Sequence, residues 1–167
     1  MAEEPTLWNE MAPLDRFFGK LSRVAPWAFY LPFSLLGFAA KTLSPRRFIM
    51  SIDSSMSQAD RELMSDEEMA RFFAEDVKEA FRQGVQAPAD DAMILYGNWG
   101  FRVAEIEAEV DLLHGTEDKF APVSHAIYLD EQLPRSNLRL YPGEGHLLVM
   151  KVFGTVFTQV AQQRRAC

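Results

Sequence analysis

The stretch VDLLHGTEDKFAPVSHAIYLDEQLPRSNLRLYPGEGHLLV, residues 110–149, decides which fold the sequence predicts. It begins with a short apolar strand over 110–115, and a second strand over 136–141 alternates apolar with polar side chains. Apolar residues at helical spacing predict a helix over 123–133 between the strands and another over 147–162 after them. Strands and helices that alternate at these intervals are typical of a parallel βαβ unit. The sequence therefore predicts an α/β fold in which a C-terminal βαβα unit has parallel strands.

The chain before this unit has a different character. The spacing of its apolar residues predicts helices at five places: 12–23, 27–42, 46–51, 65–84 and 88–97. Ser65 and Glu68 have the spacing of a capping box, in which each side chain accepts a hydrogen bond from the other residue's amide, and Gly84 is a typical helix end. We therefore expect two parts, a helical region (residues 1–100) and a C-terminal segment (residues 101–167).

The charge and the cysteine content exclude several classes of protein. A net charge of -7 at pH 7 is unsuited to binding nucleic acid, whose phosphates require a concentrated basic surface. The one cysteine, Cys167, cannot form a disulfide within the chain, and the acidic start of the sequence is unlike a secretory signal peptide. A cytoplasmic location is therefore expected.

An uncharged, strongly apolar run over residues 24–40 lies between Arg23 and Lys41. A transmembrane helix usually needs about 20 such residues, and this run is shorter. It also contains Pro26 and Pro32, and proline inside a helix removes a backbone hydrogen bond. A buried or partner-facing pair of apolar helices is favoured, and contact with a membrane is not expected.

Two side chains with chemical potential follow the two predicted strands. Asp118 lies just after the first strand and His146 just after the second, so parallel pairing would bring both to one edge of the sheet. Gly115, Gly143 and Gly145 allow the sharp turns that this placement needs. A carboxylate that orients a histidine and stabilises its protonated form is half of a nucleophilic hydrolase site.

The turns around these residues resemble the C-terminal signature of α/β-hydrolases. In that family a strand ends in His-Gly-x-x-Asp, and the next strand leads to Pro-Gly-x-Gly-His; this sequence has HGTED at 114–118 and PGEGH at 142–146. The resemblance is specific over about residues 90–160. It implies a partial α/β-hydrolase fold in which the helical region is the family's lid, Asp118 is the triad acid and His146 is the triad base.

The nucleophile of that family has no counterpart in this sequence. Family members carry their serine in a Gly-x-Ser-x-Gly turn that precedes the acid and the histidine, and no such pattern occurs here. The serines that precede Asp118 lie in a polar stretch without glycine or have the place of a helix cap: Ser51, Ser54, Ser55, Ser57 and Ser65. The chain is therefore expected to begin after the family's nucleophile, and an oligomer or a complementing N-terminal half would complete its sheet.

Two functions remain open at this point. The first is an esterase-like hydrolase that cleaves an ester-type bond in a hydrophobic small molecule when the nucleophile half is present, and that is inactive as this chain alone. The second is a non-catalytic remnant or a ligand- or protein-binding module that keeps the lid pocket. A dehalogenase or an epoxide hydrolase, both with an aspartate nucleophile in the missing turn, also fits the resemblance.

The remaining polar and soft residues are expected to have structural roles. His114 is interpreted as structural and His125 as solvent-facing, and the histidines lack the spacing of metal ligands, so neither a metal nor a cofactor is expected. The carboxylates over 60–76 alternate with basic residues and are interpreted as a solvated helix face. Four methionines either line an acyl pocket or form core: Met50, Met56, Met64 and Met69.

Overall fold

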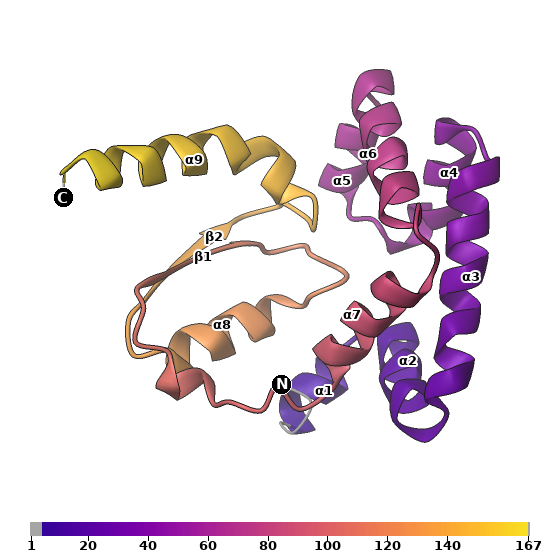
Figure 1. Cartoon of the computed structure of the whole chain (residues 1–167). Helices are drawn as coiled ribbons and strands as arrows, with labels where there is room; N and C mark the ends of the chain where they lie inside the picture. Colours follow the sequence, from indigo (N-terminus) through magenta and orange to yellow (C-terminus); the bar gives the residue numbers. More distant parts are fainter. Residues whose placement is uncertain (1–4, 167) are drawn as a thin grey trace.

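The computed structural model describes residues 5–166, in which nine α-helices accompany two strands (Figure 1). The helices and strands are α1 Pro5–Glu10, α2 Pro13–Val24, α3 Pro26–Thr42, α4 Pro45–Ile52, α5 Gln58–Met64, α6 Glu67–Ala80, α7 Gln86–Tyr96, β1 Val110–Gly115, α8 Val123–Gln132, β2 Ser136–Tyr141 and α9 Leu148–Ala166. Single 3₁₀ turns lie at Asp53–Ser55 and Val103–Glu105. Figure 1 shows α1–α7 gathered on one side of the molecule, and β1 and β2 with α8 and α9 on the other.

The predicted α/β class is wrong, because the described chain is mostly helical. β1 and β2 form one two-stranded sheet, and no further strand lies among residues 5–166. A parallel sheet normally has more strands and is covered by helices on both faces. The prediction extended the alternating pattern of residues 110–162 to the class of the whole fold, whereas α2–α7 pack mainly against one another.

The parallel pairing of the two strands is confirmed. β1 and β2 lie in register from Val110 opposite Ser136 to Gly115 opposite Tyr141. Helix α8 connects the strands and packs against both of them, on the side opposite α9 (Figure 1). The carboxyl ends of β1 and β2 therefore meet at one edge of the sheet, and the turns that follow them lie next to each other.

Proline determines where the first helices begin. α2, α3 and α4 each have proline at the first helical position, where the missing amide costs no hydrogen bond and the fixed φ suits the helix. Most of the apolar run over 24–40 lies in one helix, α3, which matches the predicted helix over 27–42 and continues through Pro32; Val24 is the last residue of α2. Among the described residues, no helix combines the length and apolarity needed to cross a membrane.

The start of α6 differs from the predicted capping box. α6 begins at Glu67, and Asp66 caps it by accepting a hydrogen bond from the Met69 amide at 2.8 Å. Ser65 instead ends α5, where its hydroxyl donates to the Glu62 carbonyl oxygen at 2.6 Å. Asp66 is as good a cap as a serine, so the sequence allowed either start.

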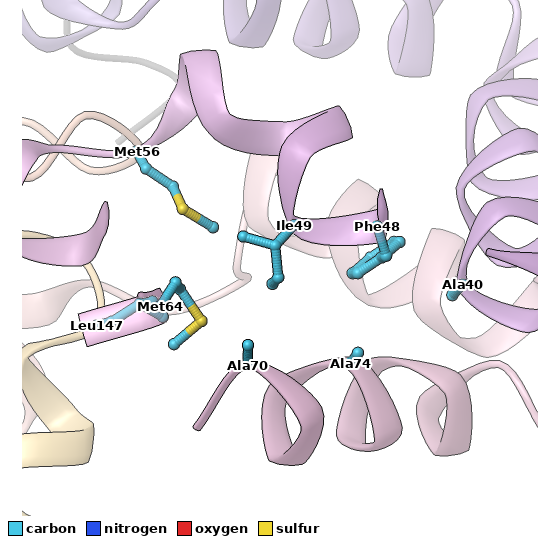
Figure 2. Packing of buried hydrophobic residues seen from close by; sticks show 8 residues of the cluster. All are labelled: Ala40, Phe48, Ile49, Met56, Met64, Ala70, Ala74 and Leu147. Carbon is cyan, nitrogen blue, oxygen red and sulfur yellow. The ribbon is translucent and has the colours of Figure 1, made fainter. Parts of the chain in front are cut away.

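The main apolar cluster lies within the helical region and includes one residue from the C-terminal segment (Figure 2). Its buried members are Ala40, Phe48, Ile49, Met56, Met64, Ala70, Ala74 and Leu147. Of the four methionines, Met56 and Met64 are core residues, Met69 packs against them, and Met50 is 70% exposed. Leu147 directly precedes α9, so this cluster anchors the start of the last helix to α4–α6.

Candidate functional site

Asp118 and His146 lie in contact at the edge where β1 and β2 end. The Nδ1 atom of His146 is 2.9 Å from Oδ2 of Asp118, and the Asp118 side chain is only 6% exposed. The other oxygen, Oδ1, accepts hydrogen bonds from the amides of Phe120 at 2.8 Å and Ala121 at 2.9 Å. The turn after β1 thus holds the carboxylate in one orientation, with one oxygen directed at the imidazole.

The two turns that carry these residues are bonded to each other. The Glu117 amide donates to the Glu144 carbonyl oxygen at 2.9 Å, and the Gly143 amide donates to the Thr116 hydroxyl at 3.0 Å. Gly143 has a φ of 78°, a left-handed conformation that favours glycine. These bonds fix the distance between the turns, which explains how Asp118 and His146 come together from positions far apart in the chain.

The contact between Asp118 and His146 changes the pKa of both residues in the direction that favours their charged forms. Burial raises the pKa of Asp118, but the hydrogen bond from His146 and the amides of Ala121 and Phe120 outweigh it, so the pKa lies below its usual value. The hydrogen bond to Asp118 raises the pKa of His146 above its usual value, against the smaller effect of desolvation. The imidazole can therefore accept a proton more readily than a free histidine.

The other two histidines have structural contacts. His114 Nε2 lies 2.9 Å from the Ala121 carbonyl oxygen, and so closes the turn that contains Asp118. His125 is not solvent-facing as predicted: it is 7% exposed, and its Nε2 lies 3.3 Å from the Leu7 carbonyl oxygen. The prediction failed because α1, which covers this face of α8, was not recognised in the sequence.

A cavity of about 350 Å³ adjoins the Asp118–His146 pair. Its wall is largely apolar, and the lining residues are Leu113, His114, Gly115, Asp118, Gly145, His146, Leu148, Val149, Val152, Phe153, Val156 and Phe157. No hydroxyl or thiol side chain is among these described residues. His146 is half-exposed, and its Nε2 has no hydrogen-bond partner among the side chains and backbone groups that the structure describes. The free imidazole nitrogen thus lacks a nucleophile in the described chain.

Sequence reasoning missed Asp60, which it placed on a solvated helix face. Asp60 is 2% exposed, and together with Ser57, also 2% exposed, it forms the capping box of α5. The Ser57 hydroxyl donates to Asp60 Oδ2 at 2.8 Å, so it is not directed at His146. The Ser-x-x-Asp spacing at 57–60 was a recognisable capping signal, but nothing local indicated that this box is buried.

Neither comparison with known proteins nor the placement of possible metal ligands adds a function to this site. No protein-family model matches the sequence, and no curated protein matches it closely enough to count as a relative. Within residues 5–166, no three histidine, cysteine or acidic side chains are grouped as metal ligands would be. The resemblance to α/β-hydrolases therefore stays a prediction that rests on the sequence.

Asp118→Asn is expected to lower the pKa of His146, because the hydrogen bond to a charged carboxylate is the largest cause of its elevation. The pH titration of the His146 ring signals by NMR would measure this shift. Asp111→Asn is the matched control, since Asp111 lies on β1, the strand that precedes Asp118, and its side chain accepts a hydrogen bond from the side-chain amide of the exposed Asn137 at 2.8 Å. An unchanged titration in Asp118→Asn would contradict the pairing in solution.

Proposed function

We propose that this chain supplies the acid and the base of an esterase-like hydrolase for hydrophobic small molecules. The observation that carries the proposal is the 2.9 Å contact between Asp118 and His146 beside an apolar cavity. The wall of the cavity suits an apolar acyl or alkyl group, and the resemblance of the two turns to those of α/β-hydrolases agrees with this chemistry.

In the proposed reaction, His146 acts as general base through Nε2 and Asp118 holds its other nitrogen. Nε2 takes the proton of an attacking hydroxyl or thiol, and the resulting imidazolium is stabilised by the Asp118 carboxylate at Nδ1. The same proton then passes to the oxygen of the leaving group as the ester bond breaks. The low exposure of Asp118 strengthens this stabilisation, because little water competes for its oxygens.

The nucleophile in this proposal comes from outside the chain. The described residues around the cavity offer no hydroxyl or thiol, and the sequence has no Gly-x-Ser-x-Gly turn. A complementing polypeptide would therefore bring the nucleophile to His146, and the chain alone would not turn over. With one cysteine and no internal disulfide, the chain suits the reducing cytoplasm, which we propose as its location.

A second candidate function is a non-catalytic module that binds hydrophobic ligands. The same lack of a nucleophile favours it, because an apolar cavity with no reactive hydroxyl can bind an ester without cleaving it. The two candidates differ in one respect: only the hydrolase requires that His146 move a proton during the reaction.

Chemical rescue tests this difference. Phenyl butyrate is incubated with the purified chain or with His146→Ala, first alone and then with added ethanethiol as the missing nucleophile. Alone, both proteins are expected to match the buffer rate. With the thiol, the parent is expected to form thioester and phenol about tenfold or more faster than His146→Ala, because general-base catalysis contributes at least that much.

Each other outcome has a definite meaning. Equal thiolysis rates for the parent and His146→Ala would overturn the hydrolase proposal and favour the binding module. Hydrolysis by the parent without thiol, absent in His146→Ala, would show that the chain turns over alone, with its own nucleophile or with water that His146 activates, and would contradict the proposal of an external nucleophile. Saturable NMR shifts of Val149 and Val152 methyl groups with phenyl butyrate would be expected under either function, and their absence would contradict both.

A further inference from the structure

The buried carboxylate of Asp60 is satisfied by donors from two distant parts of the chain. Oδ2 accepts hydrogen bonds from the Ser57 amide at 3.1 Å and the Ser57 hydroxyl at 2.8 Å, both within its own capping box. Oδ2 also accepts from the His146 amide at 3.2 Å, and Oδ1 from the Leu147 amide at 2.9 Å. Half of the donors that stabilise this buried charge thus belong to the segment of His146.

Capping of α5 explains only the hydrogen bonds between Asp60 and Ser57. An N-cap residue and its partner satisfy amides at the start of their own helix, and Ser57 with Asp60 does so. The amides of His146 and Leu147 instead lie just before a different helix, α9, which begins at Leu148. Asp60 therefore also holds the backbone that leads into α9, from another part of the fold.

The backbone around His146 packs directly against this capping box. A Cβ atom added to Gly145 would overlap the Ser57 hydroxyl and the Asp60 carboxylate, so only glycine fits there. On the other side of His146, the Leu147 side chain is 8% exposed and belongs to the apolar cluster of the helical region (Figure 2). The two neighbours of His146 are therefore both fixed to the helical region.

We propose that Asp60 is a positioning residue for His146: it fixes the backbone of the base, while Asp118 fixes the ring. Two carboxylates from different parts of the chain then together fix the position and the orientation of one imidazole. The inference rests on the proposed function in that it takes His146 as the reacting base, but its test reads the imidazole directly and requires no turnover. Asp60 also adds a smaller electrostatic contribution that raises the pKa of His146.

The variants separate this role from helix capping. Asp60→Asn keeps the size of the side chain but removes its charge and one acceptor oxygen, whereas Ser57→Ala weakens the cap of α5 and leaves the bonds to His146 and Leu147 in place. Asp53→Asn is the control for a loss of charge, since Asp53 is exposed and pairs only with Arg61. Other charged and titratable groups near His146 stay unchanged in all three: His114, Glu117, Asp118, Lys119, Glu144 and Lys151.

Two NMR measurements on each variant test the proposal. Asp60→Asn is expected to lower the pKa of His146 and to speed hydrogen exchange of the His146 and Leu147 amides about tenfold, the effect of losing one ordinary hydrogen bond. Ser57→Ala and Asp53→Asn are expected to leave both readouts at the parent values. Equal readouts in Asp60→Asn and the parent, or equal changes in Ser57→Ala and Asp60→Asn, would overturn the positioning role.

A measurement on the unaltered chain covers the case in which Asp60→Asn does not fold. Scalar couplings across hydrogen bonds are expected between the Asp60 carboxyl carbon and the amide nitrogens of His146 and Leu147. Their absence would overturn the proposal without any variant. These readouts do not depend on thiolysis, so the positioning role and the hydrolase function can fail separately.

Discussion

Phe29→Ala is expected to lower the free energy of unfolding by about 3–5 kcal/mol, the usual cost of emptying a buried aromatic site. Phe29 lies on α3 and is 0% exposed. Its ring meets the rings of Phe18 of α2 and Tyr96 of α7 edge-on, with distances between ring centroids of 6.1 Å and 6.2 Å. It therefore joins three helices. Because single domains have a total stability of only about 5–15 kcal/mol, urea unfolding followed by circular dichroism would show a large shift.

Phe38→Ala is the matched control for this prediction. Phe38 lies on the same helix, α3, but is 68% exposed, so its truncation is expected to cost less than about 0.5 kcal/mol. The difference between the two variants isolates the contribution of burial from that of helix propensity. Similar losses in both would mean that Phe38 is covered in solution or that Phe29 is not at the centre of these helices.

Gly115→Ala is expected to destabilise the protein by about 1–3 kcal/mol or more, through overpacking at the end of β1. An added Cβ would overlap the carbonyl oxygen of Glu144, and this is backbone that cannot rotate away. The Glu117 amide bonds to the same oxygen at 2.9 Å, so the two turns should separate. The pKa of His146 should then fall toward its usual value as its contact with Asp118 loosens, and an NMR titration would show it.

Gly154→Ala is expected to change stability in the opposite direction. Gly154 lies inside α9, and nothing is within 4 Å of the place where its Cβ would be. Alanine should therefore stabilise the helix by about 0.5–1 kcal/mol through its higher helix propensity. If thermal unfolding ranked the two variants in the reverse order, the close approach of the turns at Gly115 would be contradicted.

The local elements of this fold could be predicted because each has its own signal in the sequence. Alternating apolar residues placed β2 at 136–141, where the structure has it, and apolar spacing located α2, α3 and α4 to within one residue at either end. The meeting of Asp118 and His146 followed from parallel pairing, since residues after neighbouring parallel strands share one edge. Their catalytic role stays a prediction.

Features that depend on distant contacts could not be predicted. The sequence around Asp60 is typical of a solvent-exposed helix. Asp60 is buried because the segment of His146, far along the chain, packs against it. His125 is buried by α1, a short helix with little periodicity to reveal it. The fold class failed for a related reason: a local strand–helix pattern does not tell how many strands the complete sheet contains.

In the proposed positioning role, the bonds between Asp60 and the segment of His146 couple the protonation of the imidazole to the stability of α5. His146 has a raised pKa in the folded chain, so its positive charge stabilises the fold fully below the unfolded pKa near 6.5, and this contribution is lost as the pH rises through the folded pKa. Any ligand that displaces α5 must in turn alter the proton affinity of His146. Binding to the helical region and protonation of His146 are thus thermodynamically linked, so a ligand that binds there would change the pKa of the imidazole.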